Sequence, residues 1–211
     1  MMDLWKSAAA LSLVAIVGTT LLTGVDALTA ERIAAQERRV MLEQLGQIIP
    51  EHYDNAILED RIAFTDETHF PKGQQVTAYR ARQQGAPVAV VLKFSAVNGY
   101  NGDIDLLAGI NADGSLRGVR VTAHKETPGL GDAIEAGKSG WINDFAGKSL
   151  SNPETPGWAV RRDGGEFDQF TGATITPRAV VEAVRLALTY FSKHRAFLFD
   201  TVADPAGSSA P

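Results

Sequence analysis

Residues 168–177, Asp-Gln-Phe-Thr-Gly-Ala-Thr-Ile-Thr-Pro, form the segment whose side chains are best suited to hold a phosphate. Gly172 and Ala173 have almost no side chain, so a bulky group can approach the backbone there, and the hydroxyl of Thr174 follows them. Thr176 before a proline predicts a helix start, because threonine is a good N-cap and proline is favoured at the first helical position. The first turn of a helix offers unpaired N–H groups and a positive dipole to an anion. From the residues alone, this segment is either a phosphate-binding site or an ordinary turn.

The rest of the composition excludes several kinds of site. The chain has no cysteine, which removes disulfides, thiolate zinc sites, iron–sulfur clusters and cysteine nucleophiles. Its histidines have no partners at metal-ligand spacing, so we expect no metal site. There is no Ser/His/Asp order and no glycine-rich dinucleotide loop, so no catalytic residue is predicted. The net charge of −5 argues against nucleic acid as a partner, because nucleic acids select basic surfaces.

Residues 168–174 also resemble the flavinylation motif of FMN-binding domains. That motif begins with Asp and any two residues, continues with Ser or Thr, Gly and Ala, and ends with Thr or Ser. Every fixed position of that motif is matched between Asp168 and Thr174. In the family a dedicated FMN transferase takes FMN from FAD and leaves a phosphoester on the last hydroxyl, so the resemblance implies covalent FMN on Thr174. Gly172 and Ala173 are expected to contact the cofactor. Asp168 is then either a recognition residue for the transferase or a turn residue, and Thr171 either a phosphate contact or a turn hydroxyl.

Two further strings are similar to segments of the same domains. Residues 124–131, His-Lys-Glu-Thr-Pro-Gly-Leu-Gly, resemble the family's His-x-Glu-Thr-Pro-Gly-Leu-Gly loop, and residues 99–104, Gly-Tyr-Asn-Gly-Asp-Ile, resemble its Gly-Tyr-x-Gly-x-Ile segment. The resemblance implies that the loop lies along the flavin, with Leu130 against the ring. A purely structural turn needs the same proline and glycines, so both interpretations remain. The cofactor-binding residues expected in this loop are Glu126, Thr127, Gly129, Leu130 and Gly131.

The three strings, in this order and after an apolar N-terminal segment, are similar to the G subunits of Rnf (also called Rsx) ion-translocating electron-transport complexes. The C subunits of sodium-pumping NADH:quinone oxidoreductases share the domain. The resemblance implies a flavoprotein subunit that relays electrons through FMN, in a complex that couples electron transfer between ferredoxin and NAD to ion movement. Its partners would be other membrane subunits and, during maturation, the FMN transferase, and we expect no turnover by the subunit alone. A free-standing extracytoplasmic flavin reductase and an unmodified membrane-tethered interaction module are the alternatives.

The N-terminal segment predicts a single membrane span. Residues 7–25 contain no charge, and 19 residues in a helix extend about 28 Å, close to the hydrocarbon thickness of about 30 Å. Trp5 stands where an interfacial aromatic residue belongs. A cleaved signal peptide, with Lys6 as its basic region, is the alternative. The flanking charges do not decide the orientation, and the family resemblance implies an inner-membrane anchor with the flavin domain on the periplasmic side.

The sequence after residue 73 changes to strand and helix patterns. Four stretches rich in valine or alternating in polarity predict strands at residues 76–81, 87–97, 104–110 and 116–123. Asp113-Gly114 predicts a hairpin turn between the last two. Helical spacing predicts a helix at residues 177–193, whose inward side chains are expected to be Val180, Val181, Val184, Leu188 and Phe191. The fold class is therefore α+β, with a mostly antiparallel sheet and packed helices.

These patterns divide the chain into regions. Residues 29–49 have apolar side chains at helical spacing and precede Pro50, which ends helices. A stalk that continues the anchor and an ordinary packed helix explain this spacing equally well. The expected regions are a transmembrane anchor at 1–28, a helical stalk or connector at 29–73, an FMN-binding domain at 74–199 and a flexible tail at 200–211.

Overall fold

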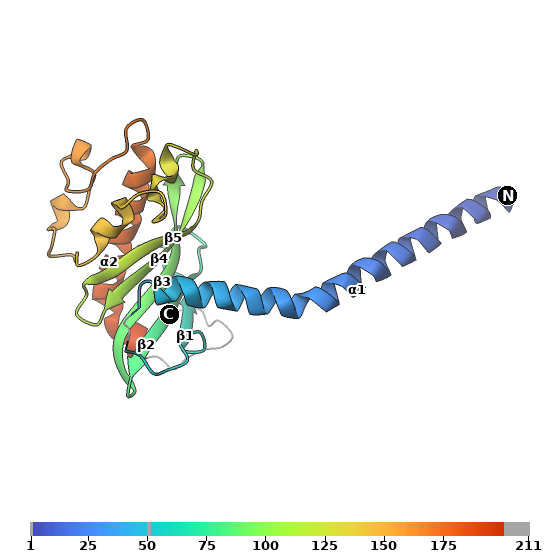
Figure 1. Ribbon diagram of the computed structural model, residues 1–211, viewed down its shortest axis with the longest axis horizontal. Coiled ribbons are helices and arrows are strands. Elements are labelled where there is room, and N and C mark those ends of the chain that lie inside the picture. Colours follow the sequence, from blue (N-terminus) through green and yellow to red (C-terminus); the bar gives the residue numbers. More distant parts are fainter. Residues whose placement is uncertain (1, 50–51, 201–211) are drawn as a thin grey trace. The chain divides into compact units, whose positions relative to one another are not determined.

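The computed structural model describes residues 2–49 and 52–200 (Figure 1). Pro50 lies outside the described residues. So do residues 201–211, which make up nearly all of the tail expected at 200–211. The chain forms two compact units that divide between Glu43 and Gln44.

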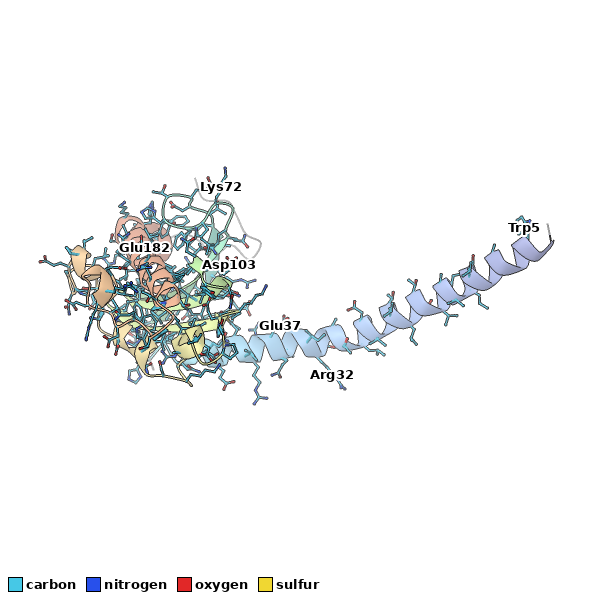
Figure 2. The ribbon with its side chains drawn as sticks, turned by 90° about the horizontal axis from the view of Figure 1, so that it is seen from above. Trp5, Arg32, Glu37, Lys72, Asp103 and Glu182 are labelled. Carbon is cyan, nitrogen blue, oxygen red and sulfur yellow. The ribbon has the colours of Figure 1, made fainter. Side chains whose placement is uncertain are left out.

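The described residues of the first unit all belong to helix α1 (Met2–Gly46), which runs without interruption through the described part of the predicted anchor and the first part of the predicted connector. From Leu11 onward it contains a window with a mean hydropathy of 1.8, none of which is buried, so by length and composition it can cross a membrane. The hydroxyl of Thr20 donates to the carbonyl of Ile16 at 2.8 Å, as expected for small polar residues in such a helix. Figure 2 shows Trp5 near the N-terminal end of α1, and Arg32 further along the helix.

The apolar stripe predicted for residues 29–49 is buried only at its end. Leu45 and Ile48 are buried within the second unit, whereas Ile33 and Val40 are 52% and 41% exposed. The Ile48 backbone passes so close to Gly109 that any Cβ there would collide with the Ile48 carbonyl group. The helix ends at Gly46, before Pro50, because the chain turns there to lie on the sheet.

The second unit contains a five-stranded antiparallel sheet in the order β1-β2-β3-β4-β5. Its strands are β1 (Arg61–Phe64), β2 (Val76–Gln83), β3 (Ala86–Gly99), β4 (Gly102–Asn111) and β5 (Leu116–Ala123). All four predicted strands are present, which confirms the α+β class and the antiparallel sheet. Strand β1 was not predicted, since four residues are too few to show a period. It lies within the region expected to be a connector, so the exact domain boundaries remain a prediction.

Helix α2 (Ile175–Asp200) packs against one face of this sheet, mainly on β3 (Figure 1). The predicted inward residues are all buried, and they meet the core-facing side chains of β3 and β4. The helix extends beyond the predicted end at residue 193, because Leu198 and Phe199 are also buried in the core. Its helical geometry is interrupted at His194. Asp200, expected to open the flexible tail, is its last residue.

The segment between β5 and α2 is irregular and holds four short 3-10 turns (Figure 1, yellow to orange), of which the first contacts α2 and the second contacts β5. They are η1 (Gly131–Ile134), η2 (Trp141–Phe145), η3 (Thr155–Gly157) and η4 (Arg161–Asp163). A cluster of aromatic rings holds them together: Trp141, Phe145, Trp158, Phe167 and Phe170. The indole N–H of Trp141 donates to the carbonyl of Asp168 at 2.7 Å, which fixes the start of the flavinylation-like string.

Candidate functional site

A cavity of about 560 Å³ lies where the three strings of the sequence meet. Its volume falls within the range of about 300–1,000 Å³ that is typical of cofactor sites. The turn after β3 contributes Tyr100, the loop after β5 and η1 contribute a second wall, and the start of α2 contributes a third. The lining residues are Tyr100, Glu126, Thr127, Leu130, Gly131, Arg162, Gly172, Ala173, Thr174, Ile175 and Thr176.

Thr174 stands at the first turn of α2, half-buried on the cavity wall. Its carbonyl accepts the N–H of Arg178 at 3.3 Å, the first bond of the helix, so Thr174 occupies the N-cap position. The prediction that Thr176 caps the helix was wrong, because the hydroxyl of Thr176 is buried and bonded elsewhere. Pro177 remains in the first turn, where its missing N–H leaves no helical bond unmade.

The residues before Thr174 form a tight turn. Gly172 has φ +83°, a left-handed conformation that favours glycine, and the Ala173 N–H closes the turn on the carbonyl of Phe170 at 3.1 Å. A Cβ on Gly172 would lie 3.6 Å from a methyl carbon of Leu130, so the two strings touch at this point. The turn therefore places an open backbone and a hydroxyl beside the Leu130 loop.

The loop around Thr127 is held by its own hydrogen bonds and by the turn after β3. The Thr127 carbonyl accepts the N–H groups of Leu130 and Gly131 at 3.1 and 3.2 Å. The Thr127 hydroxyl accepts the side-chain N–H of Asn101 at 3.0 Å. Gly129 has φ +79°, which such a turn requires. These bonds orient Leu130 toward the cavity.

Most of the large apolar side chains that are exposed among residues 52–200 gather at this cavity. Among residues 52–200 the large apolar residues with high exposure are Val97, Tyr100, Leu130 and Ile175. The last three, at 65%, 44% and 45% exposure, line the cavity. An exposed apolar patch beside polar groups is typical of a binding site, and it suits a flat aromatic ligand.

The cavity wall carries charges of both signs. The guanidinium of Arg162 is exposed at the wall, and the carboxylate of Glu126 is buried in it. At the first turn of α2, Arg178 forms a two-bond ion pair with Asp163, at 2.6 and 2.9 Å, and this hydrogen bonding lowers the pKa of Asp163. The start of α2 adds its positive dipole, which favours an anion near Thr174.

Comparison with known proteins gives the family. The sequence model described as "FMN-binding domain" matches residues 99–189, and that described as "RnfG N-terminal region" matches residues 2–48. The G subunit of the ion-translocating oxidoreductase complex of Pseudomonas aeruginosa is 48% identical over 191 residues, covering 90% of this chain and 89% of that protein. Its counterpart in Shewanella loihica is 44% identical over 200 residues, covering 94% of each chain. The chain belongs to the family of G subunits of ion-translocating oxidoreductase complexes.

The match to this family extends over both units, since the two sequence models cover α1 and the segment from β3 into α2. The G subunit of Vibrio cholerae is 43% identical over 190 residues, covering 90% of this chain and 91% of that protein. Among solved structures, the crystal structure of Shewanella oneidensis NqrC is similar, with a TM-score of 0.48 and 21% identity over 74% of this chain and 73% of that one. All three strings that line the cavity fall within the FMN-binding domain match.

The structure brings together most of the site residues expected from the sequence. Seven of them line the cavity: Glu126, Thr127, Leu130, Gly131, Gly172, Ala173 and Thr174. The other three lie outside its lining. Asp168 is 56% exposed and pairs with Arg161 at 3.0 Å, Thr171 is exposed, and Gly129 only shapes its turn.

Sequence reasoning missed four lining residues as site residues: Arg162, the two apolar residues Tyr100 and Ile175, and Thr176, which was expected only as a helix cap. Tyr100 and Ile175 lie within the strings already noted, so their exposure was the missing information. Arg162 lies in η4, outside every motif, and it reaches the cavity only through the fold of the segment that the aromatic cluster packs together. In the described parts of the chain, 2–49 and 52–200, no group of three or more His, Asp or Glu side chains is placed to bind a metal.

Proposed function

We propose that this chain carries one FMN in the cavity, joined through its phosphate to the hydroxyl of Thr174, and relays electrons within an ion-translocating oxidoreductase of the ferredoxin:NAD type. Membership of the G-subunit family and the FMN-binding domain support an electron-transfer subunit. The covalent link to Thr174 is the specific part of the proposal. It rests on one observation: the last hydroxyl of the flavinylation-like string lines the same cavity as the other two strings.

The residues present fit such a cofactor. Gly172 and Ala173 leave the backbone open for a phosphate beside Thr174, and the start of α2 stabilises a negative charge there by about 0.3–1 kcal/mol, or up to about 2 when partly buried. Leu130, Ile175 and Tyr100 offer apolar surface to an aromatic ring. A bound FMN supplies the capacity to accept and release electrons singly or in pairs.

The absence of substrate machinery favours a relay over a reductase. The sequence has no dinucleotide loop and no cysteine for a cluster. The cavity wall contains no histidine, and its Glu126 carboxylate is occupied by two protein donors. The chain's own residues therefore bind and orient the cofactor, and the redox partners are the other subunits of the complex.

The anchor and the maturation partner follow from the same proposal. The proposed anchor at residues 1–28, whose described part lies in helix α1, is a single span in the inner membrane. The flavin domain faces the periplasm. An FMN transferase loads the flavin, and the exposed Asp168 carboxylate is available for recognition by that enzyme. Covalent attachment suits a compartment without free flavin, because it removes dissociation.

The experiment is an intact-mass measurement on the full-length protein, produced with and without an FMN transferase. The proposal predicts that the transferase adds the mass of one FMN less one water to each chain, and that the adduct survives denaturation. An unmodified mass in the presence of an active transferase would contradict it and favour the unmodified interaction module.

A further inference from the structure

One buried carboxylate joins the three strings that line the cavity. Glu126 is 4% exposed. Its Oε1 accepts the backbone N–H of Asn101 at 3.1 Å, and its Oε2 accepts the hydroxyl of Thr176 at 2.5 Å. The turn after β3, the loop after β5 and the start of α2 therefore meet at a single side chain.

Two glycines leave the room that this carboxylate occupies. A Cβ on Gly131 would lie 2.7 Å from Oε2 of Glu126 and 2.8 Å from the hydroxyl oxygen of Thr176. A Cβ on Gly99 would lie 2.8 Å from Oε1. Neither glycine has a positive φ. Gly131 is needed for space around Glu126 and Thr176, and Gly99 for space around Glu126 and the Gly102 carbonyl, which a Cβ there would also meet; neither is needed for backbone conformation.

The backbone of Glu126 is fixed as well. Its N–H donates to Nδ1 of His124 at 3.0 Å, so that nitrogen acts as an acceptor. The other ring nitrogen, Nε2, then carries the proton and donates to Glu135 at 2.9 Å. The carboxylate thus projects from a loop that is braced on its far side, and it can hold α2 in place.

We propose that Glu126 is a positioning residue: by binding Thr176 it fixes the first turn of α2 and so orients the hydroxyl of Thr174 for modification. This inference rests on the proposed function, since it concerns how the acceptor hydroxyl is presented. The first turn of a helix lacks intrahelical partners for its N–H groups and frays readily, so a tether at Thr176 acts where the helix is weakest. Thr174 is only two residues away and rotates with that turn.

The main test compares Thr176→Val with Thr176→Ser in the full-length protein. The flavinylation rate is measured with purified FMN transferase and FAD. Valine keeps the shape of threonine but removes the hydroxyl that donates to the buried Glu126 carboxylate. The oriented conformation of the first turn of α2 then becomes a minor state, so the initial rate of flavinylation falls about tenfold or more. Serine keeps the hydroxyl and restores the rate. A wild-type rate in Thr176→Val would overturn the proposal.

A second pair of variants leaves every polar group in place. Gly131→Ala puts a methyl group into the space of the Glu126 carboxylate and is expected to slow flavinylation to a similar degree. Gly137→Ala is the matched control, because Gly137 has open space around its Cβ position and an ordinary φ. Equal rates for the two alanine variants would also overturn the proposal.

A flavin-free measurement separates this inference from the proposed function. In unflavinylated full-length protein, hydrogen exchange should speed up in Thr176→Val at the amides of residues 178–180, the first in α2 that bond back to carbonyls of the first turn, with β3 unchanged. If the wild type accepts no flavin, the proposed function fails, and the exchange result still decides whether Glu126 fixes the turn. Unchanged exchange in the variant would refute the tether itself.

Discussion

The hydroxyl of Thr176 lies 2.5 Å from Oε2 of Glu126, across 50 positions of sequence. This single bond connects the loop after β5 to the start of α2, two residues beyond the hydroxyl that we propose carries FMN. Both groups are buried, so the bond is shielded from water and is stronger than a similar pair on the surface. The cavity is therefore defined by a contact between strings that are far apart in the sequence.

Removal of the Glu126 charge should make the bound flavin easier to reduce. Reduction adds negative charge, and a buried carboxylate in the same cavity wall opposes it. Glu126→Gln is expected to raise the midpoint potential by an amount on the order of tens of millivolts. A spectroelectrochemical titration of the flavin-loaded full-length protein measures the shift.

The opposite sign is expected for the cation on the cavity wall. Arg162→Gln removes a positive charge that favours the reduced flavin, so the midpoint potential should fall. Its shift is expected to be smaller than that of Glu126→Gln, because Arg162 is exposed to water and its charge is screened. Identical potentials in the wild type and both variants would show that neither charge acts on the flavin.

Acid should weaken the contact between Asp66 and His69 that lies beside α2. Burial raises the pKa of Asp66, but the hydrogen bonds from the His69 side chain and backbone and from Thr68 outweigh it, so the pKa lies below its usual value of 3.8. A depressed carboxyl pKa stabilises the fold above the unfolded-state pKa, and this stabilisation is lost as the pH falls through the folded-state pKa. Asp66→Asn is therefore expected to reduce the free energy of unfolding at pH 7 by about 1 kcal/mol. Urea titrations at falling pH should show the difference from wild type shrinking in acid; a difference that stays constant would contradict this role.

The proposed topology makes a prediction for reporter fusions. A reporter enzyme that functions only outside the cytoplasm should be active when it is fused after Asp200, the last residue of α2. A paired fusion of a reporter that functions only in the cytoplasm should be silent at the same position. The reverse pattern would place the FMN-binding domain in the cytoplasm and overturn the periplasmic assignment.

The sequence was sufficient for the elements with a strong period or a strong motif. The strands around Val90, Leu106 and Val119 were predicted because buried apolar residues recur along them. Strand β1 and the extension of α2 to Phe199 were not, since both depend on burial by residues far away in the chain. Local signals carry no information about such contacts.

The site shows the same limit. The strings identified Thr174 and Leu130, which share the cavity, but also Asp168, whose side chain faces solvent. A motif records every residue that the family requires, including those that fold or mature the protein, and so it does not separate contact from support. Gly131 leaves space for the Glu126 carboxylate, and this role depends on the three-dimensional contact between the two residues, which the sequence does not show.

A relay subunit should turn over no small molecule alone. The flavin-loaded full-length protein is expected to be reduced chemically and reoxidised repeatedly, yet to oxidise NADH only slowly with quinone or ferricyanide as acceptor. The reason is that the chain offers no nicotinamide-binding sequence beside the cavity. Rapid NADH oxidation by the purified subunit would instead support a free-standing flavin reductase.

The most direct test of the central claim is in-gel flavin fluorescence of Thr174→Val after denaturation. The substitution keeps the shape of the side chain and removes its hydroxyl, so the fluorescent band should disappear while the domain still folds. Thr171→Val, which alters an exposed hydroxyl of the same string outside the cavity lining, should keep the band. Fluorescence that persists in Thr174→Val would contradict covalent attachment of FMN at this residue.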